Sequence, residues 1–179
     1  MSPTLIPIRS AETMALAIHL YEAAFPPEER RPTNEWLALM NDQTSAFTAL
    51  SITDDDGRFL GFITTWGFDA FIYVEHFAIL PEGRGHGLGS RVLQALETMA
   101  DGKPIVLEVE PPEDEMAIRR INFYERIGFH LQSIPYVQPA YASNLPSIEL
   151  CLMSTTQGMA YSCLQSVIQV IHRNVYGIR

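Results

Sequence analysis

Apolar residues recur along this chain at two spacings, one typical of strands and one typical of helices. Short apolar runs predict strands at 5–8, 47–52, 59–66, 71–80, 105–109, 129–133 and 147–153. Helical spacing predicts helices from Ser10 to the stop at Phe25-Pro26-Pro27, over 33–40, through Val92, Leu93 and Leu96, and over 113–127. The segment 134–146, which contains prolines and tyrosines, is predicted to be a loop.

Turn residues between the strands predict how the sheet is connected. Asp54-Asp55-Asp56-Gly57 is a hairpin signal, and Gly67-Phe68-Asp69-Ala70 is a second turn before the next strand. Three antiparallel strands therefore follow one another. The strand at 105–109 comes after a helical crossover and is expected to run parallel to the strand at 71–80. The fold class is thus α/β (α+β), a mixed, mostly antiparallel twisted sheet of about six to seven strands with helices on both faces.

The last segment, 158–179, has one apolar helical stripe, formed by Leu164, Val167, Ile168, Ile171 and Val175. Such a stripe must be buried against another surface. We expect this C-terminal helix to pack on the domain formed by residues 1–157, with a homodimer interface as the alternative.

Composition limits the classes of function. The 179 residues are 47% hydrophobic and 18% charged, with a mean hydropathy of +0.04, which is typical of one soluble globular domain. A net charge of −9 argues against binding to nucleic acid or to an acidic membrane and mildly favours a cationic or amine substrate. Because neither a membrane-spanning run nor a signal peptide is recognisable, a cytoplasmic location is expected. The aspartate run lacks the spacing of a calcium loop and the two cysteines form no motif, so no metal site is predicted.

The stretch 79–94, ILPEGRGHGLGSRVLQ, carries the clearest chemical signal. It has the order of a strand end, a glycine-rich turn and a helix start. Glycines let the main chain approach a ligand closely, and the first N–H groups of a helix attract an anion, so a phosphate site is predicted. A P-loop would end in Gly-Lys-Ser/Thr, and a dinucleotide fingerprint would need a glycine where Leu88 or Ser90 stands. Neither of these two patterns fits.

The pattern that does fit is Arg84-x-x-Gly87-x-Gly89 after a hydrophobic strand, which resembles the acetyl-CoA diphosphate loop of the GNAT superfamily of N-acetyltransferases. A second motif, FYERIGF from Phe123 to Phe129, is similar to the signature after the fifth strand of that superfamily. The resemblance covers residues 4–153 and implies a GNAT-like sheet with acetyl-CoA as the acyl donor. It implies donor contacts for Phe77, Ala78, Ile79, Arg84, Gly85, His86, Gly87, Leu88, Gly89 and Ser90.

Three glutamates are candidates for the base that deprotonates an amine. Glu75, four residues before Ile79 and so expected on the same strand face, is the first choice, with a pKa raised by its apolar surroundings. Glu108 and Glu110 are alternative bases or amine-binding groups. His76 is expected on the face opposite Glu75, unless a bulge shifts the alternation.

The resemblance implies that Tyr124 is the acid that protonates the departing thiolate. Tyr136, Gln138 and Tyr141, in the predicted loop, are candidates for the lining of the acceptor pocket.

The resemblance therefore implies an N-acetyltransferase that moves an acetyl group by direct attack of a primary amine. The acceptor is left open between a small molecule, a polyamine, an amino acid and a peptide N-terminus. A catalytically silent acyl-CoA-binding sensor or scaffold is the alternative. A nucleotide-binding α/β protein that uses the same loop for another phosphate is the third reading.

Overall fold

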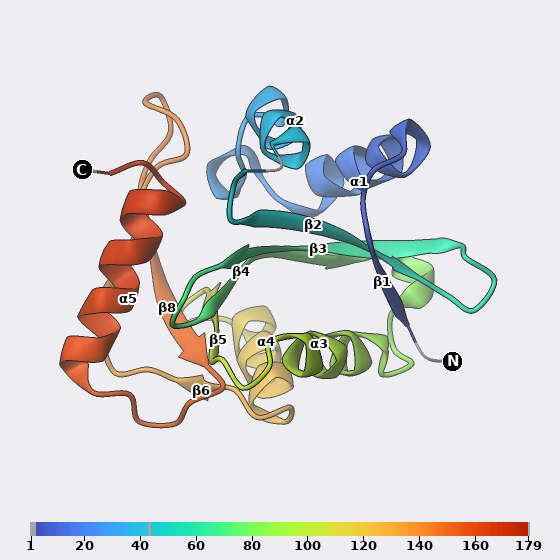
Figure 1. Ribbon diagram of the computed structural model, residues 1–179. Helices are drawn as coiled ribbons and strands as arrows, with labels where there is room; N and C mark the ends of the chain where they lie inside the picture. Colours follow the sequence, from blue (N-terminus) through green and yellow to red (C-terminus); the bar gives the residue numbers. More distant parts are fainter. Residues whose placement is uncertain (1–2, 43, 179) are drawn as a thin grey trace.

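The computed structural model describes residues 3–42 and 44–178, and Figure 1 shows a single twisted sheet with helices on both sides. The strands are β1 (Thr4–Pro7), β2 (Phe47–Thr53), β3 (Phe59–Gly67), β4 (Ile72–Ile79), β5 (Ile105–Val109), β6 (His130–Leu131), β7 (Tyr136–Gln138) and β8 (Ile148–Ser154). The helices are α1 (Ala11–Ala24), α2 (Thr33–Asn41), α3 (Leu88–Met99), α4 (Glu115–Glu125) and α5 (Tyr161–Asn174), with short 3-10 helices η1 (Pro27–Glu29) and η2 (Pro81–Gly83).

The sheet is mixed, in the order β1-β2-β3-β4-β5-β8-β6, and β7 also pairs with β8. β1 to β4 are antiparallel neighbours, and β5 runs parallel to β4 after the α3 crossover, as predicted. The predicted fold class is confirmed. The prediction of a continuous loop over 134–146 was wrong, because Tyr136–Gln138 pairs with β8 and brings the strand count of the described residues to eight.

Two apolar cores lie on opposite faces of the sheet. α1 and α2 cover one face with Tyr21 and Trp36, whereas α3 and α4 cover the other with Val92, Leu96 and Ile121 (Figure 1). The stripe of α5 is buried within the same chain, and Val167 and Ile171 belong to the α1/α2 core. Over the described residues, no helix combines the length and the apolar character needed to cross a membrane.

A β-bulge interrupts β4 at Glu75. Thr64 of β3 is opposite His76, and Thr65 is opposite Val74, so that Glu75 is the extra residue. The Thr64 hydroxyl, which is fully buried, accepts a hydrogen bond of 3.0 Å from the main-chain N–H of His76. The bulge therefore changes which face of the sheet the following side chains reach.

Glu75 and His76 both lie on the α1/α2 face, where they contact Trp66 and Tyr21 of that core. Ile79 packs on the opposite, α3/α4 face. The prediction that Glu75 shares a face with Ile79 was wrong. His76 shares the face of Glu75 because the bulge, the exception left open by the sequence, is present. Strict alternation along the strand, on which the Glu75 prediction depended, fails at the bulge.

β4 and β5 separate directly before this bulge. They are paired only from Ile72 to Val74 on β4 and from Ile105 to Leu107 on β5. From Glu75 to Ile79 the main chain of β4 has no partner on the β5 side. A gap therefore opens between the two central strands of the sheet.

Candidate active site

A cavity of about 490 Å³ occupies the gap between β4 and β5. It is bounded by both strands, by the end of α1 with η1, by α4 and by the β7–β8 segment. Its polar lining comes from Glu29, Glu75, His76, Arg84, Glu108, Glu110, Arg120, Tyr124, Gln138 and Tyr141.

The glycine loop, residues 84–90, leads from η2 into α3 beside this cavity. Gly85 and Gly87 have φ angles of 84° and 69°, which favour glycine, and Gly87 caps the N-terminus of α3. Over the described part of the chain, the N–H groups of 85–90 donate no hydrogen bond to another protein group. These free donors and the N-terminal end of the helix dipole suit an anion such as a diphosphate.

Close packing fixes the end of this loop against α4. A Cβ at Gly89 would lie 3.1 Å from Cζ of Phe123, so glycine allows the start of α3 to approach α4. The buried side chain of Leu88 anchors the same turn. Arg84 donates from Nε to the carbonyl of Ile79 at 2.9 Å and connects the loop to the end of β4.

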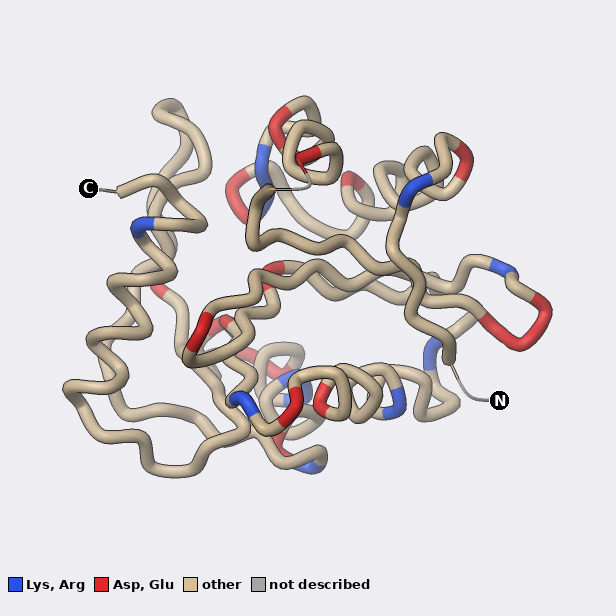
Figure 2. Tube along the Cα trace, viewed as in Figure 1, with Lys and Arg blue, Asp and Glu red and all other residues tan. Residues whose placement is uncertain are grey.

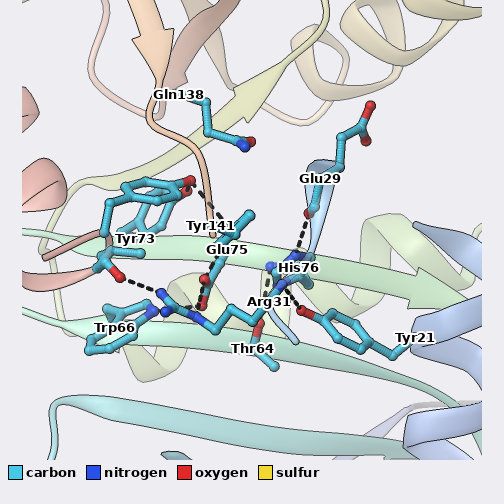
Figure 3. A network of polar contacts seen from close by, with 12 residues as sticks. Tyr21, Glu29, Arg31, Thr64, Trp66, Tyr73, Glu75, His76, Gln138 and Tyr141 are labelled. Carbon is cyan, nitrogen blue, oxygen red and sulfur yellow. Dashed lines mark hydrogen bonds and ion pairs between the residues drawn. The ribbon is translucent and has the colours of Figure 1, made fainter. Parts of the chain in front are cut away.

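Glu75 is a paired, buried carboxylate at the bulge (Figure 3). Its side chain has no exposed surface, and it accepts hydrogen bonds from Arg31 Nε at 2.9 Å and Trp66 Nε1 at 2.7 Å. The Tyr141 hydroxyl donates to the same carboxylate at 3.0 Å. Burial alone would raise the pKa of Glu75, but the charge of Arg31 and these hydrogen bonds together lower it below its ordinary value.

The prediction of a raised pKa for Glu75 was therefore wrong, because the apolar sequence of β4 gives no sign of Arg31. The residue as a whole is partly exposed although its side chain is not. The main chain at the bulge is thus the part of Glu75 that is open to solvent.

Arg31 connects four parts of the fold. Besides Glu75, its guanidinium donates from Nη2 to the carbonyl of Val175, just after α5, and lies 5.1 Å from the centre of the Tyr141 ring. Its main-chain N–H donates to the hydroxyl of Tyr21 on α1 at 2.8 Å. Only 8% of Arg31 is exposed. The sequence placed this residue in a charged connector, with no signal that it would be buried.

Glu108 is surrounded by tyrosines. It accepts hydrogen bonds from the hydroxyls of Tyr136 and Tyr176, the latter at 3.1 Å to Oε2. Among the described residues, no arginine, lysine or histidine forms an ion pair with it. Burial raises the pKa of Glu108 to about 7, although the tyrosine hydrogen bonds oppose the rise. Glu110, by contrast, is paired with Arg120.

His76 is a buried neutral imidazole on β4, on the same side of the cavity as Glu75. Its Nε2 lies 3.0 Å from the carbonyl of Glu29, and the rings of Tyr21 and Phe25 pack edge-on against it. Burial lowers the pKa of His76, and its Nδ1 is buried without a partner among the described residues.

Tyr124 lines the cavity from the opposite face. It lies on α4 between the rings of Phe123 and Phe129, at 5.1 and 5.6 Å between ring centroids. Burial raises the pKa of Tyr124 to about 12, so its phenol is protonated at neutral pH.

A family model described as "Acetyltransferase (GNAT) family" matches residues 11–129, more than half of the chain. The chain belongs to the GNAT family. This match covers the bulged strand, the glycine loop and Tyr124, but it ends before the β7–β8 segment and α5.

Individual GNAT proteins are similar to this chain over different lengths. "Putative acetyltransferase YjbC" of Bacillus subtilis (strain 168) is 32% identical over 123 residues, which are 67% of this chain and 60% of that protein. The chain thus spans less than two thirds of the length of this curated relative. A solved structure, "Putative acetyltransferase from GNAT family" from Bacteroides thetaiotaomicron, is 37% identical, with a TM-score of 0.90 over 100% of both chains.

The fold is also similar to that of a more distant structure, spermidine N-acetyltransferase from Vibrio cholerae in complex with CoA and spermine. That protein is 16% identical, with a TM-score of 0.61 over 86% of this chain and 94% of its own. At this identity the likeness concerns the fold alone.

The GNAT structure brings most of the predicted site residues together. Predicted residues that line this cavity are Glu75, Phe77, Ala78, Ile79, Arg84, Glu108, Glu110, Tyr124, Gln138 and Tyr141. Gly85, His86, Gly87, Leu88, Gly89 and Ser90 form the adjoining loop and the first turn of α3. Tyr136 is the exception, since it is buried behind Glu108 and is not part of the lining.

Three residues that contact the predicted glutamates were not predicted. Arg31 and Trp66 bind Glu75, and Tyr176 binds Glu108. Arg31 and Tyr176 come from segments distant in sequence from their glutamates, and Trp66 lies on the neighbouring strand β3. No local motif marks these contacts.

Proposed function

We propose that this chain is an acetyl-CoA-dependent N-acetyltransferase in which a primary amine attacks the thioester directly. The observation that carries the proposal is the separation of β4 and β5 beside the glycine loop. The anion site at the glycine loop, the unpaired main-chain edge of β4 and the cavity thus lie next to one another. Membership of the GNAT family supports acetyl transfer as the reaction.

The donor side of the proposal rests on main-chain groups. The free N–H groups of 85–90 would bind the diphosphate of acetyl-CoA, and the unpaired edge of Phe77, Ala78 and Ile79 would bind its pantetheine arm. An N–H of this edge near Ile79 would polarise the thioester carbonyl and stabilise the oxyanion that forms on attack. Tyr124, protonated and on the cavity lining, would supply a proton to the leaving thiolate.

The acceptor side is supported by charge. Acidic residues outnumber basic ones by 21 to 12, and Figure 2 shows the basic positions interspersed among the acidic ones over the trace. The cavity itself is lined by four glutamates and two arginines. Such a lining favours a cationic amine over an anionic acceptor. The similarity in fold to a spermidine N-acetyltransferase makes polyamines sensible members of a first acceptor panel.

The experiment is to measure saturable binding of acetyl-CoA by calorimetry and release of free CoA with a panel of amines. The panel contains a polyamine, an amino-acid amine, a small alkylamine and a peptide with a free N-terminus. We expect binding and amine-dependent release with at least one class. Absence of saturable binding would refute the donor site, and binding without release with any amine would refute the catalytic part.

A pair of matched glycine variants tests whether the loop holds the donor. Gly85 and Gly57 have φ angles of 84° and 80°, and an added Cβ at either position would meet nothing within 4 Å. Alanine costs each turn the same conformational strain, about 1–2 kcal/mol. If the Gly85→Ala loop relieves this strain by displacing its N–H groups, the Kd for acetyl-CoA should rise about tenfold. Gly57→Ala, in the β2–β3 hairpin, should leave the Kd unchanged, and equal values for the two variants would contradict the assignment.

A further inference from the structure

A chain of close polar contacts joins the two separated strands behind the cavity. The Tyr141 hydroxyl lies 3.0 Å from Oε1 of Glu75 on β4 and 3.4 Å from the Tyr176 hydroxyl. The Tyr176 hydroxyl lies in turn 3.1 Å from Oε2 of Glu108 on β5. Two carboxylates on opposite sides of the gap are thus linked by two tyrosines.

The two ends of this chain differ in charge compensation. Glu75 is held ionised by Arg31 and accepts three hydrogen bonds, so its oxygens are already engaged. Glu108 accepts hydrogen bonds only from neutral hydroxyls among the described residues, those of Tyr136 and Tyr176, and it lines the cavity. The carboxylate that can gain and lose a proton at little cost is therefore Glu108, and Glu75 acts as a fixed negative charge.

We propose that Glu108 takes the proton from the acceptor amine and that Tyr176 is a positioning residue that holds the Glu108 carboxylate at the cavity. This assignment rests on the proposed N-acetyltransferase function. An N–H bond of the acceptor ammonium breaks and an O–H bond forms on Glu108. The freed lone pair attacks the thioester carbon, the C–S bond breaks, and Tyr124 gives its proton to the departing thiolate. The second proton lost by nitrogen then restores the Tyr124 hydroxyl. Glu108 then returns its proton to water.

Groups from every neighbouring element affect the ionisation of Glu108. Burial and, less strongly, the charge of Glu75 raise its pKa, whereas hydrogen bonds from Tyr136 on β7 and Tyr176 after α5 lower it. The hydroxyl of Tyr73 on β4 lies 3.3 Å from that of Tyr176. Tyr141 and Arg31 belong to the Glu75 end, and His172 of α5 packs against the ring of Tyr136 with 5.5 Å between centroids. The net result is a pKa of about 7 for Glu108, which suits a base at neutral pH.

The test is the pH dependence of kcat/KM for amine acetylation by the wild-type chain, Tyr176→Phe and Glu108→Gln. We expect an acidic limb near pH 7 in the wild type, because Glu108 must be ionised to accept the proton. Tyr176→Phe removes a hydrogen bond that stabilises the carboxylate, so the limb should move to higher pH. Glu108→Gln should lower kcat/KM by about 10²- to 10⁴-fold and abolish the limb. Ionisation of the amine itself is common to all variants and leaves these comparisons unaffected.

Exposed residues of the same types provide the controls. Tyr161→Phe at the start of α5 and Glu149→Gln on β8 should reproduce the wild-type profile. An acidic limb that persists in Glu108→Gln, or a Tyr176→Phe variant with equal loss of activity at every pH, would overturn the proposal.

Two further measurements separate loss of the base from loss of folding or of donor binding. Circular dichroism checks that each variant folds, and calorimetry checks that it still binds acetyl-CoA. If Glu108→Gln does not fold, the position of the limb in Tyr176→Phe decides alone, and an unshifted limb overturns the assignment. If none of the amines in the panel makes the wild type release CoA, the proposed function itself fails. If CoA is released but the pH profile is the same in the wild type, Glu108→Gln and Tyr176→Phe, the proposed function stands and only the role of Glu108 is refuted.

Discussion

Arg31→Met offers the sharpest test of the buried network. The substitution keeps an unbranched stem but removes the cation that compensates Glu75, whose side chain has no exposed surface. It leaves the carboxylate with Trp66 and Tyr141 as neutral donors and deprives the Val175 carbonyl of its partner. Breaking a buried ion pair in this way costs about 3–5 kcal/mol. For a chain of this length the midpoint of thermal unfolding should fall by roughly 6–20 °C.

The dependence of this loss on pH follows from the pKa of Glu75. In the wild type this pKa is lowered, so Glu75 contributes stability above its unfolded pKa, and the contribution is lost as pH falls through the folded value. Without Arg31, burial raises the pKa above the unfolded value, and the variant gains stability as pH falls through that raised value. The difference in free energy of unfolding between the wild type and Arg31→Met should therefore become smaller from pH 7 towards pH 4.

The assay is urea unfolding followed by circular dichroism at several pH values. Arg58→Met is the matched control, since Arg58 pairs with Asp54 while 71% of its side chain is exposed, and such a pair contributes at most about 1 kcal/mol. The double variant Arg31→Met/Glu75→Gln should recover part of the loss, because the uncompensated charge is gone. A loss below about 1 kcal/mol for Arg31→Met, or one that is constant with pH, would refute the argument.

Two further outcomes follow from the site. Tyr124→Phe should lower kcat by about 10²- to 10⁴-fold, because the variant lacks the hydroxyl that donates the proton. The Kd for acetyl-CoA should be unchanged in calorimetry, since the ring still packs as before. A kcat within twofold of the wild type would contradict the acid role. Thr64→Val leaves the buried His76 N–H without its acceptor and should lower the free energy of unfolding by about 1–3 kcal/mol in urea titration. Thr65→Val, at a buried neighbour with no recorded side-chain hydrogen bond among the described residues, should cost less, and equal losses would show that Thr64 does not stabilise the bulge.

Features encoded within short stretches could be predicted from the sequence. The glycine loop is one, because its glycines, the preceding strand and the following helix are contiguous and determine free N–H groups almost by themselves. The parallel pairing of β4 and β5 is another, because a strand–helix–strand crossover allows little else. The hairpin at 54–57 was equally local.

Features that depend on distant partners could not be predicted. The bulge at Glu75 requires Thr64 on the neighbouring strand, and the low pKa of Glu75 requires Arg31, 44 residues earlier in the chain. The contact of Tyr176 with Glu108 joins residues 68 positions apart. Periodicity assigns a residue to a face, but it cannot identify the side chain that meets it there.

The two sides of the cavity come from different parts of the chain, and this affects what can be concluded about each. The glycine loop and Tyr124 fall within the range 11–129 that matches the GNAT family, whereas Tyr141 and Tyr176 follow it. Family membership therefore supports the acetyl-CoA side and leaves the acceptor to be inferred from local charge.

That charge discriminates between kinds of amine. Glu75 and Glu110 are paired with arginines, but Glu29 and Glu108 on the same lining have no ion pair among the described residues. An acceptor with a carboxylate next to its amine would meet these two uncompensated side chains. We therefore expect amines without an adjacent carboxylate to give the higher kcat/KM, and a clear preference for free α-amino acids in the CoA-release assay would contradict this inference.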